Sequence, residues 1–349
     1  MDTRVYDFDF NLLGIMNDVI SSTWSIKYNG IGTYDGHFRL EDSITDIFLK
    51  NKYLIIIEGE NQAVCTGKVA GDELLICGRT LNWLLEKRVV PPFKTREIFG
   101  ENFVSPYTIG NMVLERAFTS PPEIDENGSY IDGTVDLQRV VENFTLPEQT
   151  DAELLDRHFW RNSANTCESV MEDISEMLGL GHRLVYNVGN KSWDFEYISG
   201  VERNILVCEQ NRNLYNSTYT VDLLDDASAG WYAVYAADGD DEASDSNGWR
   251  YIKKDTDISG MRYWETPLEV SGASEAESRL AEKSVLKTVQ GTFANMHYKT
   301  DYDLGDIIRV MVVYGSFREE TKYKITGVNL WINRSGRGEE PILTPIEEE

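Results

Sequence analysis

The sequence predicts a β-rich α+β protein. Short runs of alternating or continuous apolar residues recur along most of the 349 residues, clusters of glycine and proline separate them, and fewer stretches carry apolar residues at helical spacing. A hydrophobic content of 41% and an aromatic content of 11% are typical of a folded protein. A chain of this length can form two or three domains that each bury a core.

The first 92 residues predict a small barrel or curled sheet with one helix. Alternating segments such as 24–28 (W-S-I-K-Y) and 37–40 (H-F-R-L) are separated by glycine-rich turns, and an acidic turn is expected at 41–46. Residues 53–58 (Y-L-I-I-I-E) form a continuous apolar run, which predicts a strand buried on both faces.

The stretch 64–92 predicts a hairpin followed by a helix. Two apolar-rich runs flank the G-D pair at 71–72, which can supply the positive φ of a tight turn. Thr80 can cap the helix through its hydroxyl, and the P-P pair at 91–92 ends it. Because the stretch offers no nucleophile, base or metal ligand, its residues are candidates for a structural framework. These candidates are Gly78, Arg79, Thr80, Leu81, Leu84 and Leu85. The leucines are expected to pack the helix on the first sheet, so Leu84→Ala should cost about 2–5 kcal/mol.

The middle of the chain predicts two helices and a hairpin. Residues 105–120 favour a short amphipathic helix that ends before two prolines, and a clearer helix starts at Asn165 or Thr166 and ends at a glycine. Residues 183–197 alternate around a G-N pair, which is typical of a hairpin and marks the start of a second domain. Residues 121–150 mix prolines, glycines and acids, which fits either short strands or a surface loop.

The C-terminal part predicts further strands around one helix. Strand-like runs lie at 215–221, 230–236, 249–253, 291–298, 307–314 and 322–332. Ser274 and Glu277 form a capping box, which opens a helix expected to reach Val289. The acidic stretch 238–248 lacks the spaced oxygens and closing glutamate of an EF-hand loop, so it is interpreted as a solvated turn.

The net charge of −26 disfavours nucleic acid and anionic membranes as partners, because a chain this acidic repels both. The N-terminus carries no charged-then-apolar signal segment, and no apolar run approaches the roughly 20 residues that span a bilayer. We therefore expect a chain made as a soluble protein, with no membrane anchor and no tight binding of nucleic acid.

The four cysteines form no C-x-x-C pair and are too scattered for a disulfide scaffold. If the hairpin turn uses three residues, Cys65 and Cys77 fall opposite one another, which would allow a cross-strand disulfide. Reduced, packed thiols are the favoured interpretation.

Residue patterns for catalysis or metal binding are weak. The histidines, His37, His158, His182 and His297, lie far apart, without an H-E-x-x-H motif. The chain contains no G-x-S-x-G elbow and no G-x-x-x-x-G-K-[ST] loop, and its surplus of acids makes any carboxylate pair uninformative. The sequence therefore predicts no catalytic residues, no metal site, no cofactor and no enzymatic activity.

Several landmarks occur in one order across nearly the whole chain. They include 77–90 (C-G-R-T-L-N-W-L-L-E-K-R-V-V), 231–241 (W-Y-A-V-Y-A-A-D-G-D-D), 257–265 (D-I-S-G-M-R-Y-W-E) and 301–310 (D-Y-D-L-G-D-I-I-R-V). In these landmarks and their order the chain resembles the tail hub, or tail-associated, proteins of siphophages of Gram-positive hosts. Gly305 and Asp306, in the last landmark, join the candidate framework residues.

The resemblance implies the architecture of a baseplate hub, in which two tube-type β-barrel domains with packed helices are joined by accessory domains. In this chain it implies a first barrel at 1–95, an accessory helical or loop excursion at 96–165, the first part of a second barrel at 166–222, an accessory β insertion at 223–273, and a helix and strands that complete the second barrel at 274–349.

The function implied by the resemblance is structural. We expect a homotrimeric baseplate or tail-tip hub that closes the tail tube, matches its sixfold symmetry to a threefold tip, and forms an acidic channel for DNA ejection. The implied partners are tail tube and distal tail proteins, the tape-measure protein, and tail fibre or receptor-binding proteins. The implied location is the tail tip of a virion made in the host cytoplasm. Siphophage, contractile phage and phage-tail-like bacteriocin stay open as the parent particle.

Two other interpretations remain. Aromatic residues such as Trp231, Trp249 and Trp264 are consistent with a monomeric β-rich module that binds cell-surface carbohydrate. An enzyme is the third possibility. Related proteins often carry a peptidase, lysozyme-like or fibre domain after the position of Ile346, and the absence of such an extension favours a non-enzymatic protein.

Overall fold

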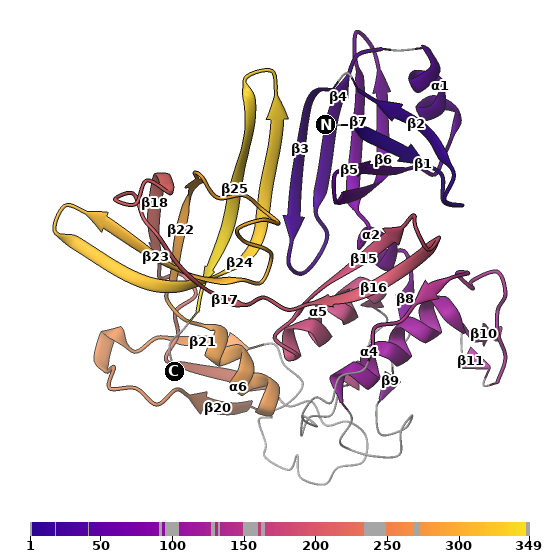
Figure 1. Ribbon diagram of the computed structural model, residues 1–349. Helices are drawn as coiled ribbons and strands as arrows, with labels where there is room; N and C mark the ends of the chain where they lie inside the picture. The colour runs from indigo at the N-terminus through magenta and orange to yellow at the C-terminus, as the bar shows by residue number, and fades with distance from the viewer. Residues whose placement is uncertain are drawn as a thin grey trace. The chain divides into compact units, whose positions relative to one another are not determined.

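The structure is a computed structural model that describes residues 2–17, 19–40, 42–90, 93–94, 105–126, 130–131, 133–148, 160–161, 165–233, 249–268 and 273–346. The chain forms two compact units, one of Met1–Ser217 with Gln290–Glu349 and the other of Thr218–Val289 (Figure 1). The five domain boundaries expected from the sequence stay a prediction. No helix in the described residues is long and apolar enough to cross a membrane.

The N-terminal part of the first unit is an antiparallel sheet in the order β3-β4-β7-β6-β5-β1-β2. Its strands are β1 (Thr3–Tyr6), β2 (Leu12–Met16), β3 (Val19–Lys27), β4 (Thr33–Phe38), β5 (Ile55–Glu58), β6 (Asn61–Ala70) and β7 (Leu74–Thr80). Its core contains Trp24, Tyr34, Phe38 and Ile56. β5 is buried along most of its length, as the continuous apolar run predicts.

A helix, α1 (Asp42–Lys50), stands where the sequence analysis expects an acidic turn, so that expectation was wrong. Ile44 and Phe48 lie one helical turn apart and are both buried in the core of the N-terminal sheet. Asp46 also pairs with Lys50 on the exposed side of the helix. The acids at the start of this segment hid the helical spacing of its apolar residues.

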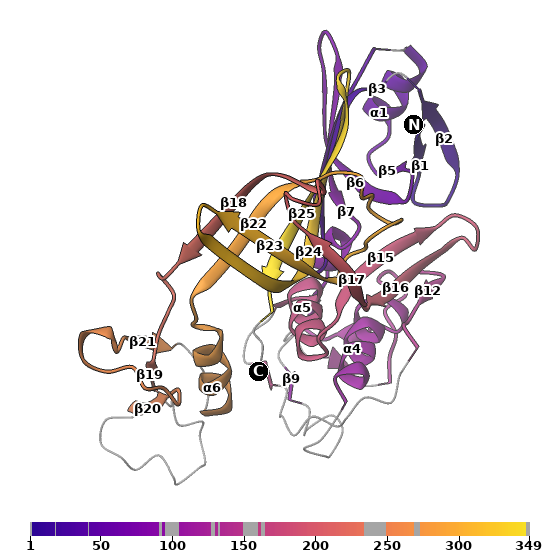
Figure 2. The same cartoon turned by 60° about the vertical axis from the view of Figure 1, so that its left-hand side comes forward.

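Strands from later in the chain extend the same sheet (Figures 1 and 2). They are β17 (Glu202–Val207), β23 (Ile307–Tyr314), β24 (Phe317–Asn333) and β25 (Gly336–Pro345). The first half of β24 pairs with β23, and its second half pairs with β3. β25 pairs with residues 323–333 of β24 on the other edge. The path from β17 to β2 is open, so the described strands form one large mixed sheet rather than two closed barrels. The prediction of a β-rich α+β fold is confirmed at this level.

The turn between β6 and β7 uses residues 71–73, and Gly71 does not adopt the positive φ expected of it. The longer turn reverses the chain without a left-handed residue at that position. A β-bulge between Cys65 and Gly67 then shifts the register, so Cys65 faces Gly78 while Cys77 faces Gly67. All four cysteines are free thiols, and burial raises the pKa of Cys65 to about 11. The preference for reduced, packed thiols is confirmed.

A helical layer follows the N-terminal sheet. It contains α2 (Trp83–Glu86), α4 (Pro106–Leu114) continued by the π-helical segment η1 (Glu115–Thr119), and α5 (Cys167–Met177). The hydroxyl of Thr166 accepts a hydrogen bond from the N–H of Ser169 and caps α5, which confirms the expected start of that helix. The helix expected at 105–120 is also confirmed, since η1 ends before the two prolines.

A hairpin of β15 (Gly181–Asn187) and β16 (Ser192–Ile198) lies against α5 (Figure 2) and confirms the one expected at 183–197. Its inward side chains share a core with the helices, including Val170, Ile174, Tyr186 and Phe195. Two-residue strands also occur in this part of the chain. They are β8 (Val89–Val90), β9 (Phe93–Lys94), β10 (Glu123–Ile124), β11 (Tyr130–Ile131), β12 (Phe144–Thr145), β13 (Trp160–Arg161) and β14 (Asn165–Thr166). Of the two readings of 121–150, the described residues therefore favour short strands.

The second unit holds the three-stranded sheet β20-β19-β21 with α6 packed on one face. Its elements are β19 (Ala229–Ala233), β20 (Trp249–Lys253), η2 (Gly260–Arg262), β21 (Glu265–Leu268) and α6 (Ala273–Glu282). The strands β18 (Leu214–Asp222) and β22 (Leu286–Phe293) pair with each other and connect the two units.

Two expectations for the second unit need correction. α6 begins at Ala273, one residue before Ser274, so Ser274 does not precede the helix as the capping box requires. α6 also ends at Glu282, and Val289 lies in β22 instead of in the helix. β-branched residues favour a strand over the last part of the expected helix, where β18 supplies a pairing partner. The acidic stretch 238–248 lies outside the described residues.

Candidate functional site

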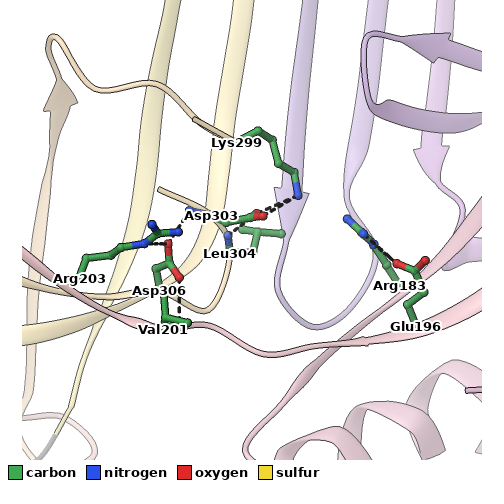
Figure 3. Close-up of polar contacts among 8 residues, drawn as sticks. All are labelled: Arg183, Glu196, Val201, Arg203, Lys299, Asp303, Leu304 and Asp306. Carbon is green, nitrogen blue, oxygen red and sulfur yellow. Dashed lines mark hydrogen bonds and ion pairs between the residues drawn. The ribbon is translucent and has the colours of Figure 1, made fainter. Parts of the chain in front are cut away.

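The carboxylate of Asp306 joins two segments that are far apart in the sequence (Figure 3). One oxygen accepts a hydrogen bond of 2.9 Å from the N–H of Val201, and the other accepts from Nε of Arg203 at 2.7 Å and from the N–H of Asp303 at 2.9 Å. Asp306 is only 2% exposed. These bonds fasten the segment leading into β17 to the turn before β23.

Two glycines allow the backbones to meet at this junction. A Cβ on Gly200 would lie 1.8 Å from the carbonyl oxygen of Gly305, and a Cβ on Gly305 would lie 2.4 Å from the ring of Tyr28. Gly305 also has a φ of +85°, a conformation that favours glycine. The Tyr28 hydroxyl donates to the carbonyl of Ile198 at 2.9 Å. The junction therefore brings together the ends of β3 and β16 and the turn before β23.

The sequence analysis placed Gly305 and Asp306 among the framework residues, and they lie at this junction. The remaining candidates lie elsewhere. Gly78 is in β7, where a Cβ would be 3.0 Å from the carbonyl oxygen of Val64, and Arg79 is exposed. The Thr80 hydroxyl accepts a hydrogen bond of 2.7 Å from the N–H of Gly32. Thr80 is thus the last residue of β7 and does not cap α2, contrary to the expectation from the sequence.

The leucines in and just before α2 join a core formed by α4, α5, the β15–β16 hairpin and one side of the N-terminal sheet. Leu81 and Leu85 are 2% and 0% exposed, and Leu84 is partly buried against the same core. The aromatic core of the N-terminal sheet is a separate cluster. The expectation that the helix packs on that sheet holds in part, because the cluster that contains Leu81 and Leu85 includes Tyr6, Ile55 and Val64 of the sheet together with residues of α4 and α5.

Because Leu85 is fully buried and Leu84 is not, we expect Leu85→Ala to be the more costly change. Leu85→Ala should lower the free energy of unfolding by about 2–3 kcal/mol, since it leaves a cavity, and Leu84→Ala by about 1 kcal/mol. Denaturant unfolding of both variants measures the difference. Equal losses would mean that the two side chains are buried alike.

Two carboxamides close the outer edge of β15, a feature that the sequence analysis missed. Asn82 donates to the carbonyl of His182 at 3.3 Å and accepts from the N–H of Leu184 at 2.9 Å. Gln62 binds both backbone groups of Tyr186, donating at 3.0 Å and accepting at 2.8 Å. The side chains thus satisfy an edge that would otherwise offer free donors and acceptors to another strand.

One cavity of about 290 Å³ lies beside this edge, and a second of about 290 Å³ adjoins it between β3, β24 and β25. They share Trp24, Glu60, Asn61, Tyr298 and Lys299 in their linings. Lys299 is held by both oxygens of Asp303 at 2.9 Å (Figure 3). The linings mix aromatic rings with charged side chains, which suits binding more than covalent chemistry.

The side chains of Ser175, His182 and Glu168 form a hydrogen-bonded row in the helical layer. Ser175 Oγ lies 3.0 Å from Nδ1 of His182, and Nε2 lies 3.2 Å from Glu168 Oε2. Ser175 and His182 are 0% exposed and Glu168 is 3% exposed, so a substrate has no access to the serine. A serine, a histidine and a glutamate are also the residue types of a catalytic triad. Because all three are buried here, we interpret the row as a structural hydrogen-bond network.

The other described histidines also contact carboxylates. His37 lies 3.4 Å from Glu73 and His297 lies 3.5 Å from Glu339, both at exposed positions. Within the described parts of the chain, no three His, Cys, Asp or Glu side chains are placed to bind a metal ion. His158 lies outside the described residues.

Buried tyrosines predict a loss of stability at high pH. Burial raises the pKa of Tyr323 to about 12, and burial, aided by Glu339, raises the pKa of Tyr302 well above its usual value of 10.0. The unfolded chain releases these protons near pH 10, whereas the folded chain retains them. The stabilisation is therefore complete below pH 10 and is lost progressively above it.

An alkaline titration followed by phenolate absorbance and circular dichroism tests this expectation. The buried tyrosines Tyr302 and Tyr323 should ionise together with the loss of structure. Complete ionisation near pH 10 in a protein that keeps its circular dichroism would contradict the assignment.

Comparison with known proteins identifies solved structures that share this fold. No protein family model matches the chain, and no curated protein matches it by sequence. Solved structures that match over nearly the whole chain include three tail proteins. A tail protein from Neisseria meningitidis MC58 is 10% identical and has a TM-score of 0.58, with 99% of this chain and 96% of that chain covered.

The other two structures come from prophages. The 43 kDa tail protein of prophage MuSo2 from Shewanella oneidensis is 8% identical, with a TM-score of 0.56 and coverage of 99% of this chain and 98% of that chain. Prophage tail protein gp18 from Listeria monocytogenes EGD-e is 11% identical, with a TM-score of 0.55 and coverage of 100% and 96%. The resemblance drawn from the sequence is thus confirmed at the level of the fold, and this chain has the fold of prophage tail proteins.

Proposed function

We propose that the chain is a structural subunit of a phage or phage-like tail, in which three copies form a hub at the tail tip. The observation that carries the proposal is the fold match, which covers nearly the full length of three tail proteins from different bacteria. A match of this extent includes both parts of the large sheet and the second unit, so it does not depend on one common motif.

The free edge of the large sheet supports assembly with other copies. Among the described strands β2 pairs only with β1, and its Leu12 and Ile15 are 49% and 42% exposed. An apolar strand edge of this kind is a template for association, which monomeric proteins usually cover or charge. We therefore infer that a neighbouring chain covers β2 in the ring, and Ile15→Lys should lower the fraction of assembled protein. Tyr53→Lys, at a residue of similar exposure outside β2, is the matched control.

The acidic composition supports a conduit for DNA. A basic channel wall would bind the duplex tightly, because its cations would neutralise phosphates and release their counterions. A wall of net negative charge gains no such affinity, so the duplex can slide past it. With a net charge of −26, the ring is expected to have an acidic lining around a channel wider than a duplex and to bind no duplex DNA tightly. Binding of DNA fragments by the purified protein, measured at low and high salt, tests this part. Tight binding that weakens with salt would contradict it.

Localisation in the particle tests the structural role. An antibody against the chain should label one end of tails in electron micrographs, and particles made without the gene should lack finished tail tips. Labelling along the whole tail, or normal tips without the gene, would contradict the hub. Contacts with tail tube, distal tail, tape-measure and fibre proteins belong to the same proposal.

A further inference from the structure

Aromatic side chains gather on the exposed face of the sheet in the second unit. Trp231 on β19 and Trp249 and Tyr251 on β20 are 43%, 54% and 40% exposed. The register pairs Trp231 with Tyr251, whose ring centroids lie 4.7 Å apart, and pairs Ala233 with Trp249. Cross-strand partners point to the same face, so the three rings form a continuous platform.

The opposite face of this sheet is already covered. Tyr232 and Leu268 point toward α6 and pack with Ala276 and Leu280. The burial of β20 alternates strictly, with Trp249, Tyr251 and Lys253 exposed. The face of the sheet that carries the platform is therefore not packed in the core of this unit. Large aromatic rings that are exposed together are typical of a binding surface.

Polar groups lie at the edge of the platform. The hydroxyls of Tyr251 and Tyr263 are 2.9 Å apart, and either can donate to the other. Glu265 and Lys253 both pair with Ala229 in the register, so their side chains share the face of the rings and are exposed. A ligand on the platform would thus meet flat apolar surfaces beside hydrogen-bond donors and acceptors.

The net charge of the second unit limits the classes of ligand that the platform can bind. Acidic residues outnumber basic ones between Thr218 and Val289, so the unit repels polyanions such as nucleic acids and phosphate-rich polymers. Neutral sugars fit the surface, because a pyranose ring presents C–H groups to aromatic faces and hydroxyl groups to polar side chains at its rim. We propose that the exposed face of β19 and β20 binds a neutral glycan chain, with Trp231 and Trp249 as the stacking residues.

This proposal does not depend on the hub, since it concerns one unit of one chain. The test uses the full-length protein and soluble, uncharged oligosaccharides built from N-acetylglucosamine, glucose, galactose or rhamnose. Binding is followed by tryptophan fluorescence and by calorimetry. At least one oligosaccharide should bind, and Trp231→Ala or Trp249→Ala should weaken its binding about tenfold or more.

Controls separate loss of binding from loss of folding. Trp249→Phe keeps a ring and should retain most of the affinity, and Tyr53→Ala removes an exposed ring of the first unit and should change nothing. The thermal midpoints of all variants should stay close to that of the parent. The proposal is overturned if no neutral oligosaccharide binds, if binding survives both alanine changes, or if only a phosphorylated polymer or a proline-rich peptide binds.

Discussion

Replacing Asp306 with alanine is expected to lower the free energy of unfolding by about 2–3 kcal/mol. The change removes the acceptor for the backbone N–H groups of Val201 and Asp303 and for Arg203. Asp306 is only 2% exposed, so these bonds are lost from the buried side of the junction, whereas the guanidinium of Arg203 is 38% exposed and stays accessible to water. Denaturant unfolding monitored by circular dichroism measures the loss.

A matched control removes a carboxylate from an exposed ion pair. Glu320 lies 3.1 Å from Arg309, and both side chains are 43% exposed. Glu320→Ala should cost at most about 1 kcal/mol, because exposed pairs contribute little. Asp306→Asn should fall between the two, since its amide oxygen can still accept one hydrogen bond. Similar losses for Asp306→Ala and Glu320→Ala would show that the junction contributes little to stability.

Gly200→Ala is expected to have an effect of similar size, about 3 kcal/mol or more. The added Cβ would lie 1.8 Å from the carbonyl oxygen of Gly305, and backbone atoms on both sides leave no flexible side chain to move away. The two segments that meet there, the one before β17 and the turn before β23, would have to separate, which would also disturb the hydrogen bonds of Asp306. Thermal unfolding and the yield of folded protein measure this effect.

Alanine substitutions at two other glycines distinguish the effect of steric crowding from the effect of backbone strain. A Cβ on Gly71 meets no atom within 4 Å and its φ is not positive, so Gly71→Ala should change stability by less than about 0.5 kcal/mol. Gly179 has the same open space but a φ of +67°, so Gly179→Ala should cost about 1 kcal/mol from strain alone. If Gly200→Ala resembles Gly71→Ala, the close approach at the junction does not exist in solution.

Local signals predicted much of the fold. The helix capped by Thr166 and the β15–β16 hairpin follow from residue spacing and turn chemistry within short windows. The errors have local causes too. α1 was missed because acids obscured its apolar spacing, and Val289 was assigned to a helix because a strand partner, β18, lies far away in the sequence.

The junction could be predicted only in part. Resemblance singled out Gly305 and Asp306, but their partners Gly200, Val201 and Arg203 lie about a hundred residues earlier and carry no motif of their own. The amides that close the edge of β15 gave no signal either, since asparagine and glutamine near turns are common. Such contacts depend on tertiary packing, which no short window of sequence encodes.

The mass of the purified protein in native conditions tests the proposed hub most directly. One chain has a mass of 39.8 kDa. The purified protein is expected to form a species of three chains that persists on dilution to micromolar concentration and that Ile15→Lys shifts toward the monomer. A single species of 39.8 kDa at every concentration, alone and with the tail proteins encoded beside it, would contradict the account.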